Sequence, residues 1–175
     1  MGIVSSELAF RCDKFKVYKI EKQNHDGKGY TDWDIVYNDS VVVLSVTKDR
    51  QAVLVKEHVD YSDKNVMQLP GGGTKDGESV EEAALRELGE ETGYTGDRPV
   101  LLMKLSQSTR KLKHDVYYFA VTNARKSIEQ KFDADEIINE VVLMDFDELL
   151  SMAQNGTLET TGDAEAVEEF NKRGL

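Results

Sequence analysis

LPGGGTKDGESVEEAALRELGEETGY, residues 69–94, is the most informative stretch of this sequence. Pro70 and the three glycines after it predict a loop, because neither residue type suits the interior of a regular element. Ser79 and Glu82 have the three-residue spacing of a capping box, which predicts that a helix begins there. Gly93 is suited to end that helix. We therefore expect a loop followed by a helix of about three to four turns.

The acidic residues of this helix are not spread over its solvent face. At about 100° per residue, an arc of about 60° combines two small apolar residues with two acids. These four residues are Val80, Ala84, Glu87 and Glu91. Glu81, Glu82 and Gly89 are expected to face solvent. Two carboxylates therefore continue the stripe that faces the core.

Glu87, Glu90 and Glu91 crowd the end of the helix, where the helix dipole disfavours anions. Glu87 and Glu91 also form a like-charged i, i+4 pair. A bound cation would offset the cost of burying them. Carboxylate oxygens suit a hard ion such as Mg²⁺ or Mn²⁺, and the lack of nearby cysteine or histidine argues against zinc. The alternative interpretation is a solvated charged face.

Several fixed positions of this stretch match a known motif. They are Gly72, Glu78, Arg86-Glu87-Leu88, Glu90-Glu91 and Gly93-Tyr94. With this spacing, residues 72–94 resemble the Nudix box, and the chain resembles the Nudix hydrolase family. The resemblance implies a Mg²⁺-dependent enzyme, with Mn²⁺ as an alternative metal. Such an enzyme hydrolyses the diphosphate bond of a nucleoside diphosphate joined to another group.

The resemblance also implies residue roles. Glu87, Glu90 and Glu91 would bind metal together with the backbone carbonyl of Gly71. Arg86 would orient these catalytic acids alongside Glu78, since a guanidinium can hold a carboxylate in a two-pronged pair.

A general base is also required, and in many family members it comes from a loop after the box. We expect Glu136, in the acidic segment 133–136, to act as this catalytic base. The alternative for Glu136 is an ordinary solvated loop acid.

Strand-like segments flank the predicted helix on both sides. They cover residues 17–20, 34–37, 41–46, 52–55, 100–105, 116–121 and 137–144, with a hairpin turn at 48–51. Closing helices are expected at 146–154 and 164–172. Strands and helices mix without regular alternation, so we expect an α+β fold. By resemblance it is a mixed β-sheet sandwiched between helices, in one domain over 1–175, with an N-terminal β extension over 1–40.

The segments 29–36, 41–46, 52–55 and 68–72 are similar to the ADP-ribose and nucleoside-diphosphate-sugar pyrophosphatase branch of the family. In that branch the N-terminal strands often form a homodimer, which we therefore expect. Two positions depart from the branch pattern. Gln68 stands where glutamate is common, and no proline follows Pro99. The resemblance therefore favours the sugar-nucleotide class over ADP-ribose in particular.

The chain has 22 basic and 33 acidic residues, a formal charge of −11. Such a surface repels nucleic-acid backbones and anionic membranes, so we expect a small-molecule substrate, with neither nucleic acid nor membrane as a partner. Cys12 is the single cysteine, which fits a reducing compartment. Residues 1–10 lack the basic-then-apolar pattern of a signal peptide, and no apolar run has membrane-spanning length, so we expect a cytoplasmic protein.

Two residues outside the box are candidates for binding substrate. Trp33 could stack on a base, although packing in the core or in a dimer is the alternative. Arg110 belongs to a basic segment with Lys111, Lys113 and His114 that suits a phosphate. A hairpin tip with solvated charges is the alternative for this segment.

Hydrolysis of a nucleoside-diphosphate sugar, such as ADP-ribose, is the function that the sequence favours. One alternative is a nucleoside triphosphate pyrophosphohydrolase that removes oxidised nucleotides. A second alternative, of a different kind, is a catalytically inactive Nudix domain that senses a ligand. The three acids argue against an inactive domain, because a binding module has no need of three mutually repelling carboxylates.

Overall fold

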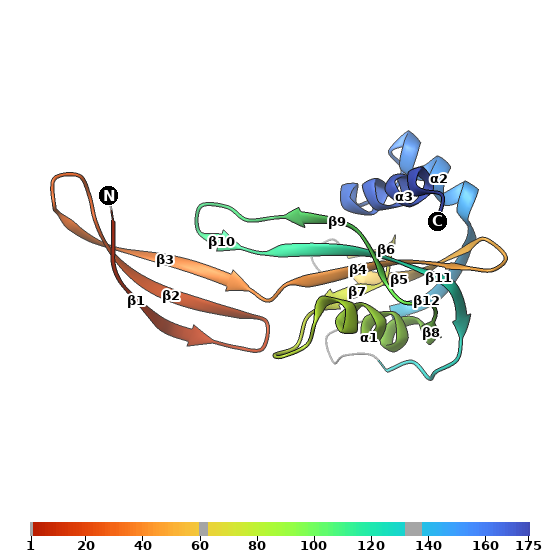
Figure 1. The fold of residues 1–175 in the computed structure, drawn as a ribbon, viewed down its shortest axis with the longest axis horizontal. Coiled ribbons are helices and arrows are strands. Elements are labelled where there is room, and N and C mark those ends of the chain that lie inside the picture. Colours follow the sequence, from red (N-terminus) through yellow and green to blue (C-terminus); the bar gives the residue numbers. More distant parts are fainter. Residues whose placement is uncertain (1, 60–62, 132–137) are drawn as a thin grey trace.

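The computed structural model describes residues 2–59, 63–131 and 138–175. Its main body is a mixed sheet with helices on both faces, and a smaller sheet projects from one end (Figure 1). The central strands of the large sheet are β12 (Ile138–Asp145), β5 (Gln51–Val59), β4 (Ser40–Thr47), β11 (Asp115–Lys126) and β8 (Tyr94–Thr95). The strands β6 (Lys64–Gln68), β7 (Gly71–Gly73) and β9 (Val100–Ser106) pair with β5, β4 and β11. The neighbours β4 and β11 run parallel, which makes the sheet mixed.

Both faces of β4 are buried, which explains its continuous apolar run. Val41 and Val43 pack on one face with α1 (Val80–Thr92). Leu44 and Val46 pack on the other face with α2 (Phe146–Asn155) and α3 (Thr161–Arg173). The two-residue period of the strand therefore divides the core into two clusters, one for each helical layer.

The projecting sheet contains β1 (Gly2–Arg11), β2 (Phe15–Gln23), β3 (Gly29–Tyr37) and the short β10 (Leu112–Lys113), in that order. The chain returns to this sheet through β10, which pairs in parallel with β3. The ammonium groups of Lys22 and Lys111 both pair with the buried carboxylate of Asp32. The pair with Lys111 connects the extension to the segment that leads into β11, and the pair with Lys22 lies within the extension.

The structure confirms the α+β sandwich, the N-terminal β extension, and the helices and strands expected on either side of the box. It also contains β1, which the sequence did not predict. Its register against β2 shifts between Ile3 and Ser5 and again between Leu8 and Phe10. Such irregularities break the two-residue alternation by which a strand is recognised.

Two expectations within residues 69–94 were wrong. Gly71–Gly73 form the short strand β7 and not a loop. Position 71 requires glycine in this strand, because a Cβ there would collide with the carbonyl oxygen of Val41. Gly89 is buried instead of facing solvent. A side chain at Gly89 would meet Ile128 Cδ1 at 2.5 Å, so Ile128 covers this part of α1.

Among the described residues, no helix has the length and apolar character needed to cross a bilayer.

We expect Asp32→Asn to loosen the pairing of β10 with β3, because an amide cannot form ion pairs with Lys111 and Lys22. The test is hydrogen exchange at the amide of Ile35, which donates to the carbonyl of Lys111 at 2.7 Å. Exchange at this amide should be several-fold faster in the variant, and Glu7→Gln on the exposed β1 is the matched control.

This stabilisation should depend on pH. The ammonium groups of Lys111 and Lys22 hold the pKa of Asp32 well below its usual range. A lowered carboxyl pKa stabilises the fold above the unfolded value of about 3.9, and the stabilisation is lost as pH falls through the folded value. Wild-type protection of Ile35 should therefore fall only in strong acid. Equal exchange in wild type and Asp32→Asn at neutral pH would contradict the assignment.

Candidate functional site

The helix α1 carries Glu87, Glu90 and Glu91, which form the acidic cluster. It begins and ends where the sequence predicts. Ser79 caps it, with the hydroxyl and backbone of Ser79 and the side chain of Glu82 forming a complete capping box. Gly93 ends it in the left-handed conformation, at φ 75°. Because both ends are fixed, the orientation of the acids around the helix axis is fixed as well.

Glu87 and Glu91 face inward, as their spacing predicted. Their exposed fractions are 4% and 3%, whereas Glu90 is partly exposed. The last turn of α1 contains no basic residue to offset them. Burying two carboxylates at the negative end of a helix costs free energy unless other groups compensate their charge.

Arg86 supplies much of that compensation. Its Nε and one terminal nitrogen donate to the two carboxylate oxygens of Glu78, at 2.7 and 2.9 Å. Its other terminal nitrogen donates to Glu87 at 2.7 Å and to Glu90 at 2.9 Å. The Glu78 carboxylate, followed by those of Glu87 and Glu90, raises the pKa of Arg86. The guanidinium in turn lowers the pKa of Glu78.

The glycine segment, Gly71–Gly73 in β7, lies directly against the acids of α1. The amide of Gly71 donates to Glu91 Oε2 at 3.2 Å. A Cβ on Gly72 would lie 2.5 Å from Glu87 Oε1, so glycine is required for this contact. The segment β7 thus brings backbone groups and two buried carboxylates to the same place.

The donor set fits a hard divalent cation, because it consists of carboxylate oxygens beside closely packed backbone. Among the described residues, however, no three histidine, cysteine, aspartate or glutamate side chains are grouped so as to hold a metal ion as they stand. Arg86 binds one carboxylate oxygen of Glu87 and one of Glu90. The second oxygen of each carboxylate would then be the one to face a metal ion.

A cavity of about 420 Å³ opens beside Glu87, between the main body and the projecting sheet. Its polar lining combines basic and acidic side chains with groups from the glycine segment. The basic side chains are Lys14, Lys75 and His114, and the acidic ones are Asp13, Glu57 and Glu87. Tyr37 adds an aromatic wall, with its ring centroid 5.7 Å from that of His114. Because carboxylates balance the basic side chains, such a cavity suits an anionic ligand that binds together with a cation and carries a flat or apolar part.

A second cavity, of about 520 Å³, lies on the α3 side of the glycine segment. The two cavities share Ser40, Gly72 and His114. The hydroxyl of Ser40 and Nε2 of His114 are 2.9 Å apart, within hydrogen-bond distance. The second cavity is lined by amide and hydroxyl side chains and by Asp163, whose pKa is raised by burial. The glycine segment therefore has binding space on two sides.

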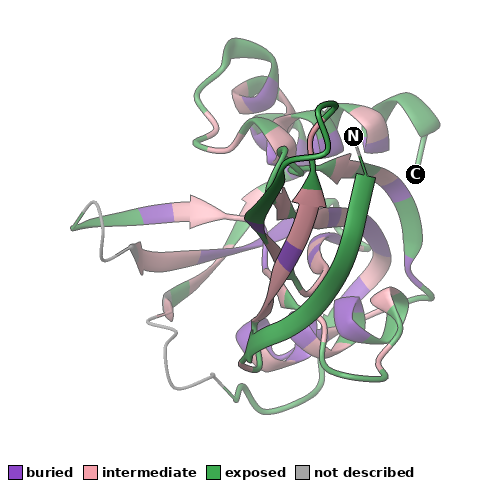
Figure 2. Ribbon diagram, turned by 90° about the vertical axis from the view of Figure 1, so that its left-hand side faces the viewer, coloured by how far each residue is buried: buried purple, intermediate pink, exposed green. Residues whose placement is uncertain are grey.

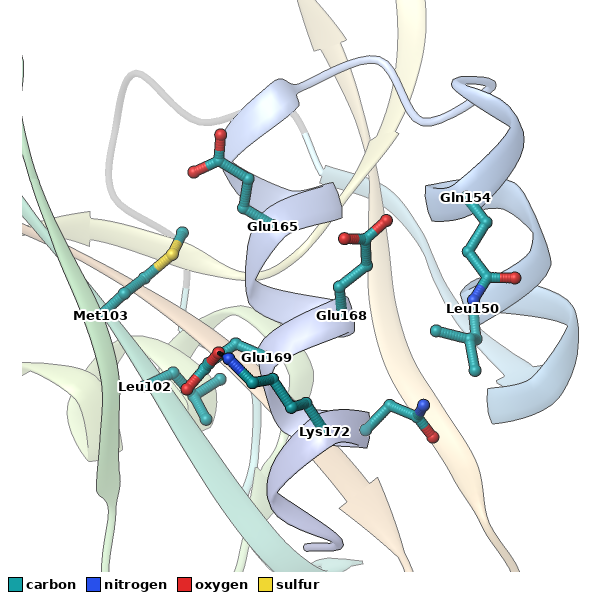
Figure 3. Close-up of a pocket in the computed structure, with 9 residues that line it drawn as sticks. Leu102, Met103, Leu150, Gln154, Glu165, Glu168, Glu169 and Lys172 are labelled. Carbon is teal, nitrogen blue, oxygen red and sulfur yellow. Dashed lines mark ion pairs between the residues drawn. The ribbon is translucent and has the colours of Figure 1, made fainter.

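A third hollow, of about 660 Å³, lies between α2, α3 and β9. Figure 3 shows Glu165 and Glu168 beside it, and Glu169 near Lys172. None of the residues of the acidic cluster on α1 lines it. With three carboxylates and one ammonium group, its lining is unsuited to a polyanion.

The structure does not bring all predicted site residues together. Glu87, Glu90 and Glu91 lie with Arg86 and Gly71 around the glycine segment. Trp33 is exposed on β3, and Arg110 is exposed before β10. Neither lines the cavity beside Glu87.

Glu136 lies outside the described residues.

Sequence reasoning missed several residues that line the two cavities. Lys14 and Tyr37 belong to no motif, and Lys75 stands at a variable position of the box. These three residues share the cavity because of how the extension meets the main body. His114 was noted only as part of a basic segment. Asp163 gave no signal, because a single aspartate near the start of a helix ordinarily reads as a solvated residue favoured by the helix dipole.

Comparison with known proteins agrees with this architecture. Residues 36–168 match the family model described as the NUDIX domain. The chain is 24% identical over 166 residues to the ADP-ribose pyrophosphatase of Bacillus subtilis (strain 168), covering 94% of this chain and 89% of that protein. It is 49% identical over 107 residues to the ADP-sugar pyrophosphatase of Mus musculus, covering 54% of this chain and 49% of that protein.

A solved structure described as an ADP compounds hydrolase has the same fold. The TM-score is 0.75 at 19% sequence identity, and the match covers 98% of this chain and 92% of that chain. The family model spans well over half of the sequence. It includes the acidic helix, the glycine segment and the residues of β4 and β11 that line the second cavity. The chain therefore belongs to the Nudix domain family.

Proposed function

We propose that this protein hydrolyses the diphosphate bond of a nucleoside-diphosphate sugar to a nucleoside monophosphate and a sugar phosphate. The observation that carries the proposal is the cavity beside Glu87, where buried acids and a glycine segment meet cationic side chains. The printed names of the relatives from Bacillus subtilis and Mus musculus support an ADP-ribose-like or ADP-sugar substrate.

The charge distribution supports a diphosphate ligand. In a chain of net charge −11, the cavity gathers Lys14, Lys75 and His114. Lys75 Nζ lies 3.6 Å from Glu90 Oε2, so a cation already stands beside the acidic cluster. The carboxylates of Asp13, Glu57 and Glu87 line the cavity as well, so phosphate oxygens would bind to these basic groups together with a divalent metal ion.

The two neighbouring cavities, which share Ser40, Gly72 and His114, support a substrate with two parts. A nucleoside-diphosphate sugar has one group on each side of its diphosphate. Gly72, which both cavities share, lies against Glu87. We infer that the diphosphate lies near Gly72, with the two ends of the substrate in the two cavities.

Mg²⁺ is our proposed metal, held by Glu87, Glu90, Glu91 and the carbonyl of Gly71, with Mn²⁺ as an alternative. Bound there, it would neutralise charge on the diphosphate and lower the pKa of a water molecule. Arg86 donates to Glu87 and Glu90, and its positive charge offsets their mutual repulsion. Glu136 is our proposed general base, taking a proton as the water oxygen bonds to phosphorus and the bridging oxygen leaves with the other phosphate.

Glu91→Gln should lower turnover about a hundredfold or more, because it removes a charged group from the metal-binding cluster. The assay is release of monophosphate from a panel, with and without Mg²⁺. The panel contains ADP-ribose, ADP-glucose, GDP-mannose, UDP-glucose, NADH, dinucleoside polyphosphates and oxidised nucleoside triphosphates. Glu168→Gln, exposed on α3, is the matched control.

The panel also separates the alternative functions. Metal-dependent turnover of one sugar nucleotide would support the proposal and name the substrate. Turnover restricted to triphosphates would replace it with triphosphate pyrophosphohydrolysis. Ligand binding without any turnover would indicate an inactive sensor.

Arg86→Lys should lower kcat about tenfold or more while leaving the fold intact, because lysine cannot bind Glu78, Glu87 and Glu90 together. The measurements are steady-state kinetics and thermal unfolding. Arg98→Lys, in an exposed loop, is the control. Unchanged kcat in Arg86→Lys would show that the guanidinium has no orienting role.

We also propose that the protein is a cytoplasmic homodimer formed through the projecting sheet. The strand β1 is exposed along its length and is the terminal strand of that sheet (Figure 2). It presents the exposed apolar side chains of Ile3, Val4, Leu8 and Phe10. An unprotected apolar edge strand is a template for pairing with another chain. A second copy of this chain is the occupant that the family resemblance favours.

Phe10→Glu should convert the dimer to a monomer, because it places a charge in the proposed interface. Analytical ultracentrifugation of the wild type should give twice the chain mass of 19.7 kDa, and the variant should give the chain mass itself. Leu143→Glu is the control, since Leu143 is an exposed apolar residue on β12, at the edge of the large sheet. A monomeric wild type would contradict the proposal.

A further inference from the structure

The segment between β6 and β7 connects the two helical layers. Leu69 packs in the cluster beneath α2 and α3, whereas Gly72 lies against Glu87 of α1. Only Pro70 and Gly71 separate these two residues, so the chain crosses from one face of the sheet to the other over residues 69–72. Over so short a stretch we expect a displacement of Leu69 to shift Gly72.

Hydrogen bonds hold this segment to several elements. The carbonyl of Pro70 accepts from the amide of Val43 on β4 at 2.8 Å. The amide of Gly71 donates to Glu91 of α1 at 3.2 Å. The segment therefore has fixed contacts downstream of Leu69.

The upstream contact comes from α3, which is far away in the sequence. The amide of Leu69 donates to Asp163 Oδ2 at 3.1 Å, across 94 residues. Asp163 is only 6% exposed, and Leu69 is buried as well. A buried amide without an acceptor is costly, so this bond restrains the backbone of Leu69.

The start of α3 is packed so that Asp163 reaches Leu69. Gly162 lies against the hydroxyl of Tyr118 on β11, where a Cβ would collide with that hydroxyl. Asp163 occupies the third position of the helix, from which an acid often bonds back to the helix cap. The side chain of the cap residue Thr160 makes no capping hydrogen bond. The carboxylate of Asp163 accepts from the amide of Leu69 and so holds the segment that leads to the acidic cluster.

We propose that Asp163 is a positioning residue, which fixes Leu69 and so sets how Gly71 and Gly72 meet the acids of α1. The inference rests on the proposed function, since it concerns the same site. Asp163 acts from the opposite face of the sheet, without itself belonging to the acidic cluster.

The experiment compares Asp163→Asn, Asp163→Ala and the control Glu168→Ala on the same helix. Asparagine retains a carbonyl that can accept the amide of Leu69, and alanine does not. The readouts are amide hydrogen exchange at Leu69 and Gly71, Mn²⁺ affinity by electron paramagnetic resonance without substrate, and kcat and KM.

We expect Asp163→Ala to accelerate exchange at Leu69 and Gly71 and to weaken Mn²⁺ binding and lower kcat by about 10–100-fold. Asp163 also lines the second cavity, so KM can change as well, and the proposal requires the losses in Mn²⁺ affinity and kcat. Asp163→Asn should recover most of both losses. Wild-type Mn²⁺ affinity and kcat in Asp163→Ala would overturn the proposal. A rise in KM with unchanged kcat would also overturn it, because that pattern indicates direct contact with substrate.

If Asp163→Ala fails to fold, Asp163→Glu decides. Its carboxylate is displaced by one methylene, so the proposal requires reduced kcat and Mn²⁺ affinity although an acceptor remains, and wild-type values would overturn it. The exchange and Mn²⁺ measurements need no turnover. They therefore test Asp163 even if the wild type hydrolyses none of the nucleotides, which would refute only the proposed function.

Discussion

The packing of acidic side chains around Arg86 is the constraint on which the rest of the site depends. A single guanidinium binds Glu78, Glu87 and Glu90, and the neighbouring Glu91 accepts the amide of Gly71. Without these contacts, like charges at the end of α1 would repel one another and resist burial. The contacts make the cluster compatible with a folded core and leave it on a surface that faces a cavity.

The glycine segment places backbone groups next to that cluster. Because Gly71 pairs closely with β4 and Gly72 touches Glu87, backbone groups reach the acids without an intervening side chain. The chain enters this segment from Leu69, in the core cluster of the other face. Both helical layers therefore influence the geometry of one short strand, and this connection gives the α3 side of the molecule a part in positioning the site.

The projecting sheet contributes in a different way. It brings Lys14 and Tyr37 to the cavity beside Glu87, while Lys22 and Lys111 hold Asp32 within the sheet. Of the lysines named here, Lys22 and Lys111 bind Asp32 of the extension, and Lys14 lines the cavity. The exposed strand β1 lies at the far edge of the same sheet (Figure 2). Dimer formation through this edge and construction of the cavity would then involve a single element.

The sequence by itself determined the helix α1, its two ends, the inward direction of Glu87 and Glu91, the α+β class and the family. These features follow from local rules: capping chemistry, helical periodicity and fixed motif spacing act within a few residues of each other. The pairing of Arg86 with Glu78 was also predictable, because both residues belong to one motif. The sequence did not reveal β1, whose register shifts hide its alternation, or the strand character of Gly71–Gly73.

Only the tertiary structure decided which distant residues meet at the site. Leu69 and Asp163 are 94 residues apart, and Ser40 and His114 are 74 apart, yet each pair forms a hydrogen bond. Tyr37, Lys14 and Lys75 share a cavity only because the extension folds beside the glycine segment. Such contacts depend on strand order and layer packing, for which a single sequence contains no local signal. Local periodicity therefore determined the acidic helix. Long-range packing determined the cavity, the charged groups that line it and the hydrogen bond from Leu69 to Asp163.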